Sequence, residues 1–228
     1  MSRPAQIQFL SRLARVYDVV VRGMGFTPLW RAMAAVAAPV PGERALDVCT
    51  GTGGVALELA RRGARVIGLD LAGGMLRRAR HKHNDDGPRA HFVQMDARHL
   101  AFADGSFSLV TCAMALHEMA EVERTQVLRE VNRVASDRVI IADYRVPRDR
   151  VRALLFRVAT AYEYIESDDF ERFVCRDLGE RLGHIGFLVG SPHDVGAYRI
   201  WPCRVTQRVA PVARAWVAGT ADATARLQ

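Results

Sequence analysis

Between residues 44 and 143 the chain alternates five short apolar runs with helical segments, and this alternation strongly limits its fold. Each run is nearly continuous in Val, Ile, Leu and Ala, which is typical of strands that are buried on both faces. Such strands, separated by helices, predict a parallel sheet covered on both sides. The strands are expected at 44–48, 65–69, 90–94, 107–112 and 138–142, and the helices at 55–62, 74–83 and 122–134.

The residues on either side of this region show other patterns. Upstream, apolar spacing predicts a helix over 5–20, and Thr27-Pro28 opens a second helix that runs to about residue 38. Downstream we expect two helices and then two strands that form an antiparallel end to the sheet, at 151–164, 168–182, 186–189 and 197–200. The predicted fold is α/β and Rossmann-like: a seven-stranded, mostly parallel sheet with an antiparallel end strand, helices on both faces and a helical lid.

The length of 228 residues, half of them hydrophobic and a quarter charged, suits one domain with small appendages. We expect an N-terminal helical lid segment over 1–42 and a main domain over 43–203. A lid insertion is expected within that domain at about 146–180, and a C-terminal tail over 204–228.

The net charge of +7 would suit a nucleic-acid-binding protein, but the distribution of the charge does not. Lys82 is the single Lys in the chain, and the Arg residues are scattered rather than gathered in one patch. Abundant Arg beside much Ala, Val and Gly is typical of GC-rich coding sequence. We therefore expect a small-molecule substrate rather than a nucleic acid.

The apolar and cysteine patterns bear on location and metal binding. No run of about 18 apolar residues is present, so no membrane-spanning helix is expected, and the charged N-terminal stretch does not match a secretory signal. Cys49, Cys112, Cys175 and Cys203 form no C-x-x-C pair, and no Cys/His spacing matches a zinc site. We expect reduced thiols, a cytoplasmic location and no metal.

The segment Ala45-Leu-Asp-Val-Cys-Thr-Gly-Thr-Gly-Gly54 joins the first strand to the next helix through a glycine-rich turn. Glycines let the backbone turn tightly and let a ligand approach without meeting a side chain. The N–H groups at the start of the following helix are available to a ligand. The glycine spacing does not fit the G-x-G-x-x-G dinucleotide fingerprint, and the Lys-Ser/Thr of a phosphate-binding loop is missing. A tight turn without a ligand is the alternative.

Two acidic residues follow the next strands of the predicted sheet. Asp70 follows the second strand, where a carboxylate can accept both hydroxyls of a ribose. Asp96 follows the third strand and could accept a hydrogen bond from an exocyclic amine, as on adenine. Each could instead cap a helix or a turn. Because the glycine turn and both acids lie at the carboxyl edge of one parallel sheet, where ligands bind in such folds, the three together favour a ligand site.

These segments give the chain a resemblance to the class I S-adenosylmethionine-dependent methyltransferases, with the nearest likeness to the C-methyltransferases of ubiquinone and menaquinone biosynthesis. The resemblance covers about 43–147 and extends weakly to Tyr17-Asp18, 162–167 and 186–187. It implies S-adenosylmethionine as cofactor and a methyltransferase domain over 43–203. The segments that carry it are ALDVCTGTGGVALELA (45–60), VIGLDLAGGMLRRAR (66–80), ARHLAFADGSFSLVTCAMALHEM (97–119), LREVNRV (128–134) and VIIADYRVP (139–147).

The resemblance also implies which residues hold the cofactor. Cys49 and Thr50 stand where many members of the family have Gly, and both are small enough to keep the site. The implied set is Asp47, Gly51 and Gly53 under the methionine end, with Cys49 and Thr50 in the same turn, Asp70 at the ribose, Leu71 and Met75 near the adenine, Asp96 and Ala97 at the adenine edge, and Ala113 and Met114 beside cofactor and acceptor.

Since the methyl group is carried on a sulfonium, the protein has to align an acceptor and remove one proton. His117 directly follows the fourth strand and could deprotonate a phenol or an enol, with Glu118 orienting it or capping the next helix. Alternatively, His117 only shapes the pocket. The quinone subgroup carries an Arg-Asn pair in this stretch, whereas this chain has His117-Glu118. This difference bears on the identity of the acceptor.

Several tyrosines lie in segments expected to fold over the pocket, where a phenol group can hydrogen-bond a substrate hydroxyl. Tyr17 is the second catalytic candidate, because Tyr17-Asp18 matches the family. Tyr144, Tyr162 and Tyr164 are expected to pack as ordinary aromatic residues.

We expect methyl transfer to a small, fairly apolar acceptor, quinol- or phenol-like, at carbon or oxygen. An RNA or protein methyltransferase and a non-catalytic S-adenosylmethionine-binding partner of a larger assembly remain as alternatives. A nicotinamide-dependent oxidoreductase is disfavoured by the glycine spacing. Contact of the apolar lid with a membrane surface and the oligomeric state both stay open.

Overall fold

The computed structural model describes residues 26–84, 90–146, 149–160 and 168–205. The strands of this part form one sheet in the order β3-β2-β1-β4-β5-β8-β6, and β7 pairs with β8. Their bounds are β1 (Arg44–Val48), β2 (Arg65–Asp70), β3 (Ala90–Gln94), β4 (Phe107–Ala113), β5 (Ala135–Tyr144), β6 (Phe187–Val189), β7 (His193–Val195) and β8 (Tyr198–Val205).

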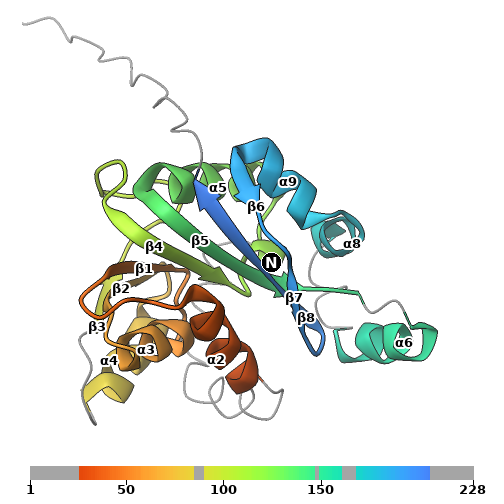
Figure 1. The fold of residues 1–228 in the computed structure, drawn as a ribbon. Helices are drawn as coiled ribbons and strands as arrows, with labels where there is room; N and C mark the ends of the chain where they lie inside the picture. Colours follow the sequence, from red (N-terminus) through yellow and green to blue (C-terminus); the bar gives the residue numbers. More distant parts are fainter. Residues whose placement is uncertain (1–25, 85–89, 147–148, 161–167, 206–228) are drawn as a thin grey trace, which may run out of the picture.

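The predicted α/β class and the mostly parallel sheet are confirmed. Neighbouring strands from β3 to β5 are parallel, and β8 is antiparallel to β5, β6 and β7. The reversed strand differs in position from the prediction, because β8 lies between β5 and β6 and leaves β6 at the edge (Figure 1). β8 is also longer than the predicted 197–200, since Pro202 and Arg204 interrupt its apolar pattern while its pairing with β5 continues to Arg204.

Helices cover both faces of the sheet. In Figure 1, α2, α3 and α4 lie on one side of the sheet and α5 and α9 on the other. The bounds are α2 (Phe26–Ala37), α3 (Gly54–Arg61), α4 (Gly73–Asn84), the 3-10 helix η1 (Leu116–Glu118), α5 (Glu121–Val134), α6 (Arg150–Ala159), α8 (Asp168–Cys175) and α9 (Leu178–Ile185).

The single helix predicted over 168–182 is two helices, and this prediction was wrong. The break lies between α8 and α9, where the Asp177 carboxylate accepts the Gly179 N–H at 2.8 Å and caps α9. The helix predicted over 151–164 ends at Ala159 as α6, and its last residues lie outside the described part, as do the helix predicted over 5–20 and most of the tail.

The core has two halves because successive strand residues point to opposite faces of the sheet. In β1, Ala45 packs with α2, α3 and α4, whereas Leu46 and Val48 pack on the side of α5. Leu109 and Val110 of β4 divide in the same way. Among the described residues, no helix is both long and apolar enough to cross a bilayer.

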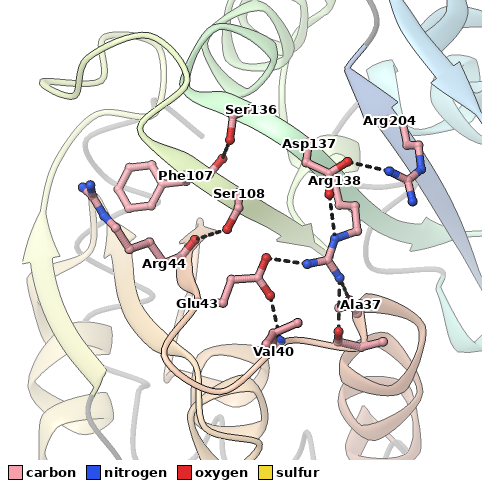
Figure 2. A network of polar contacts seen from close by, with 11 residues as sticks. Ala37, Val40, Glu43, Arg44, Phe107, Ser108, Ser136, Asp137, Arg138 and Arg204 are labelled. Atoms are coloured by element: carbon pink, nitrogen blue, oxygen red, sulfur yellow. Dashed lines mark hydrogen bonds and ion pairs between the residues drawn. The ribbon is translucent and has the colours of Figure 1, made fainter.

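A polar network at the amino edge of the sheet fixes the end of α2 (Figure 2). The Arg138 guanidinium of β5 donates to the carbonyl oxygens of Ala37 and Ala38 and pairs with Glu43. Glu43 accepts the Val40 N–H at 2.9 Å through its other oxygen. Burial of Glu43 would raise its pKa, but these hydrogen bonds outweigh burial and lower it. The network holds α2 against the strands that carry the site.

Candidate active site

The turns after β1 and β4 and a side chain of α2 enclose a pocket at the carboxyl edge of the sheet, with a cavity volume of about 50 Å³. The structure brings six of the residues expected for the cofactor into its lining: Asp47, Cys49, Thr50, Gly51, Ala113 and Met114. The lining also contains Trp30, Thr52, Gly54 and Val55, which the sequence analysis did not single out. Of these, Trp30 comes from a helix distant in sequence, so no local motif could have indicated it.

The glycine-rich turn has an unusual backbone. Gly51 and Gly53 have φ of 53° and 80°, in the left-handed region that glycine adopts freely. Cys49 is also left-handed, with φ of 56°. Met114, after β4, has φ of 53°, so the pocket is bordered by two non-glycine residues in a conformation that costs about 1–2 kcal/mol each. Such backbone strain is frequent at binding sites.

Asp47 organises this turn from below. It is only 2% exposed, and its two oxygens accept the hydroxyls of Thr111 and Thr50, each at 2.6 Å. The oxygen bonded to Thr50 also accepts the Ala56 N–H at 3.2 Å, in the first turn of α3. Burial raises the pKa of Asp47 to about 6 even though these hydrogen bonds act in the opposite direction. Asp47 therefore ties β1, β4 and α3 together beneath the pocket.

Asp70 lies next to this turn at the end of β2. Its carboxylate accepts the Gly51 N–H and the Ala72 N–H, both at 2.8 Å and one on each oxygen. Burial raises its pKa. Each carboxylate oxygen has a second acceptor position, so Asp70 is able to bind two hydroxyl groups while it keeps both backbone contacts. The capping alternative and the ribose role are thus compatible.

Asp96 is held differently, by Arg98. The Arg98 guanidinium donates to both carboxylate oxygens at 2.6–3.1 Å, and the Arg98 N–H donates at 2.9 Å. Arg98 also donates to Glu123 at 2.9 Å. Asp96 is therefore one member of an ion-pair network, and a ligand amine would have to share its oxygens with Arg98.

The other expected cofactor residues lie near β2 and β3 or in the turn. Met75 and Ala97 are buried, and Leu71 is half-buried. Gly53 is the N-cap of α3 and does not line the pocket. A Cβ at Gly53 would come 3.0 Å from the Phe92 ring, so its glycine is required by the left-handed turn and by this close approach.

His117 and Asp143 form a buried pair, and neither of them lines the pocket. His117, in η1, places Nδ1 2.7 Å from Oδ1 of Asp143, at the end of β5, and the two side chains are 3% and 0% exposed. Asp143 also accepts the N–H groups of Leu116, His117 and Tyr144. In the tautomer in which Nδ1–H donates to the Asp143 carboxylate, Nε2 carries the lone pair of the neutral ring.

Aromatic rings surround this imidazole. The Tyr144 ring lies at 4.8 Å between centroids, and the rings of Phe170 and Phe173 in α8 lie at 5.9 and 6.4 Å. Glu118 Oε1 lies 3.9 Å from His117 Nε2. Asp143 was not among the predicted site residues, although an acid at the carboxyl end of a strand is the same signal that indicated Asp70.

The remaining candidates are the tyrosines. Tyr144 is buried against His117, in agreement with ordinary aromatic packing. Tyr17, Tyr162 and Tyr164 lie outside the described residues. Within the described part of the chain, no three His, Cys, Asp or Glu side chains come together as metal ligands.

Comparison with known sequences bears on the family of the chain. A family model described as a methyltransferase domain matches residues 45–138, which include the glycine turn, Asp70, Asp96 and His117. The demethylmenaquinone methyltransferase of Thermus thermophilus is 33% identical over 210 residues, which cover 89% of this chain and 86% of that protein. An uncharacterised methyltransferase of Synechocystis is 33% identical over 153 residues, or 67% of this chain and 70% of that protein.

Solved structures show the same fold at lower identity. A methyltransferase in complex with the Haloferax volcanii Trm112 activator matches with a TM-score of 0.65 and 16% identity, over 87% of this chain and 98% of that chain. The magnesium protoporphyrin IX methyltransferase of Synechocystis, solved with bound SAM, matches with a TM-score of 0.57 and 19% identity, over 83% of each chain.

The residues of the pocket fit the cofactor of these enzymes. The glycine turn lines the pocket and gives a ligand access to the backbone. Asp70 does not line the pocket, but it bonds the Gly51 N–H of this turn and its carboxylate can accept further hydrogen bonds from hydroxyls. Because the family model and the relatives are methyltransferases, a nicotinamide-dependent oxidoreductase is no longer an alternative. Fold and relatives agree that the chain belongs to the class I S-adenosylmethionine-dependent methyltransferases, with S-adenosylmethionine as its cofactor.

Proposed function

We propose that the protein methylates a small, fairly apolar acceptor of the phenol or quinol type, at carbon or oxygen, and that His117 is its general base. The observation that supports this proposal is the buried His117–Asp143 pair directly after β4, at 2.7 Å and among aromatic rings. Aromatic surroundings suit an apolar ring, and a fixed imidazole suits the removal of a phenolic or enolic proton.

S-adenosylmethionine, when bound, would supply an electrophilic methyl group, with S-adenosylhomocysteine as the leaving group. Nε2 of His117 takes the proton of the acceptor, and the acceptor gains the methyl group. The Asp143 carboxylate stabilises the imidazolium that results and holds the ring in one tautomer, as carboxylates do for other catalytic histidines. The proton then passes to solvent when the product leaves.

Access to His117 involves α8. Phe170 and Phe173 cover the imidazole and leave it only 3% exposed, so an acceptor has to displace these rings to reach Nε2. We assign α6 and α8 to the lid insertion expected at about 146–180. In this proposal the lid exchanges its own aromatic rings for that of the acceptor and excludes water from the reaction.

The name of the Thermus thermophilus relative indicates the acceptors to test first. Reduced 2-prenyl-1,4-naphthoquinone without the ring methyl, a simple catechol and bulk tRNA would each be incubated with the protein and S-adenosylmethionine, and S-adenosylhomocysteine and product mass would be measured. Turnover of the naphthoquinol or the catechol supports the proposal. Turnover of tRNA alone points to the RNA alternative, and cofactor binding without turnover of any acceptor points to a non-catalytic protein.

The role of His117 is tested with His117→Gln, and His184→Gln is the matched control because His184 is exposed in α9. General-base catalysis is worth about 100-fold or more, so turnover should fall by that factor in His117→Gln only. Calorimetric binding of S-adenosylhomocysteine should be equal in both variants. Unchanged turnover in His117→Gln would reduce His117 to a residue that shapes the pocket.

A further inference from the structure

Trp30 of α2 stands against the glycine turn. A Cβ built on Gly54 would lie 2.6 Å from Nε1 of Trp30 and 2.8 Å from its Cδ1. The indole therefore lies directly on the backbone where α3 begins, and position 54 has to be glycine as long as the ring stays there. Trp30 is also part of the pocket lining, together with Gly51 and Met114.

The indole is held in place from behind. The Phe26 ring stacks on Trp30 with 5.4 Å between centroids and 26° between planes. Phe26 is buried and contacts the Tyr198 ring of β8 at 5.0 Å. The far end of α2 is fixed by Arg138, which bonds the Ala37 carbonyl (Figure 2). A large side chain anchored at this many points is preorganised for a ligand.

The order of the strands says which end of the cofactor meets Trp30. Asp96 follows β3 and Asp70 follows β2, whereas the glycine turn follows β1 and Met114 follows β4. Because these strands lie in the order β3-β2-β1-β4, a nucleoside held at β3 and β2 extends its methionine end toward β1 and β4. That is the part of the edge where the pocket and Trp30 lie.

The methionine end of S-adenosylmethionine carries a sulfonium cation. Among the ten residues that line the pocket, Asp47 is the single acid. The hydroxyls of Thr50 and Thr111 and the Ala56 N–H already bond its carboxylate, and burial favours its neutral form. An aromatic face attracts a cation without needing a charge of its own, and Trp is the best side chain for this.

The geometry points to Trp30 as a cofactor-binding residue whose indole contacts the sulfonium of S-adenosylmethionine and contributes less to the binding of the neutral product S-adenosylhomocysteine. This inference rests on the cofactor of the family and does not depend on the acceptor or on His117. It gives the protein a means to release the product, because loss of the positive charge weakens the contact with the indole.

The test is calorimetric binding of both compounds to the wild type, Trp30→Leu and Trp30→Phe. Removal of the aromatic face should weaken the binding of S-adenosylmethionine about tenfold in Trp30→Leu. The binding of S-adenosylhomocysteine should weaken only about two- to threefold, because apolar contact is lost. Trp30→Phe should keep most of the preference. Equal losses for the two compounds in Trp30→Leu, or no loss for either, would overturn the inference.

A second variant separates the contact from a general loss of structure. The methyl group introduced by Gly54→Ala would displace the indole. This change should therefore weaken the binding of S-adenosylmethionine about fivefold when Trp30 is present, and have little effect in the Trp30→Leu background. Equal effects in both backgrounds would contradict the contact. Failure of cofactor binding in the wild type would instead refute the methyltransferase site itself, and Asp70→Ala serves as the non-binding control.

Discussion

The buried Asp47 carboxylate predicts how the stability of this protein changes with pH. Burial raises its pKa from 3.8 to about 6, while in the unfolded chain it returns to its ordinary value. Between these two values the folded state binds a proton that the unfolded state has released. The free energy of unfolding therefore falls as the pH rises through this interval, and it does so by about 1.4 kcal/mol per pH unit for one proton. Over an interval of about two units the loss amounts to ~3 kcal/mol.

Asp47→Asn isolates this contribution, because the amide does not titrate and all other groups cancel in the comparison. Urea unfolding of both proteins at half-unit steps from pH 4 to pH 8 gives the difference in free energy of unfolding. We expect the wild type to lose ~2 kcal/mol relative to the variant between pH 4 and pH 6, and the difference to stay constant above about pH 7.

Thr111→Val is the matched control for the cause. Its hydroxyl donates to Asp47 at 2.6 Å and favours the charged carboxylate, so its removal should raise the pKa further and extend the loss of stability to higher pH. A difference between wild type and Asp47→Asn that is independent of pH would refute the reasoning. It would mean that the carboxylate keeps its ordinary pKa despite its burial.

Two further predictions follow from the same part of the chain. Asp70→Ala should abolish the stabilisation by S-adenosylmethionine, which in the wild type should reach about 2.7 kcal/mol at 100 times the dissociation constant; a thermal-shift titration measures both, and an unchanged shift would remove Asp70 from the site. Glu43, whose pKa is lowered, stabilises the fold above its ordinary value of 4.5 and loses this effect as the pH falls through its folded value. Glu43→Gln should therefore cost on the order of 1 kcal/mol at pH 7 and much less at pH 3.5 in urea unfolding, and equal costs at both would count against the Arg138 network.

The parallel part of the sheet could be predicted because its strands are continuous apolar runs. β1 and β3 have the predicted bounds, and β2 and β4 extend one residue beyond them. β5 begins at Ala135, earlier than predicted, because the polar residues Ser136 and Asp137 interrupt the apolar pattern at its start. The structure nevertheless pairs Ala135 with Phe107 of β4. β7 is three residues long and mostly exposed, so its pairing with β8 leaves no periodic signal.

The candidate site also contains residues that could be predicted from the sequence and residues that could not. The glycine turn and Asp70 follow strands directly, so their positions at the carboxyl edge could be predicted from the alternation of strands and helices. Asp143 ends a predicted strand, as Asp70 does, and the same signal could have indicated it. Trp30 could not be predicted, because the packing of α2 on α3 brings it to the site. Contacts of this kind depend on tertiary packing, which a pattern in one segment does not contain.

The position of β8 has a consequence for how the protein is made. β5 precedes β8 by more than 50 residues in the chain, yet β8 is its only neighbour on that side among the described strands. While the ribosome is still adding the intervening residues, β5 is an open edge whose backbone groups are unpaired. β6 emerges earlier than β8 but has no partner in the sheet until β8 is present. The nascent chain is therefore most prone to pair wrongly with other chains during this interval. The sheet is completed beyond β5 only when residues 198–205 have left the exit tunnel.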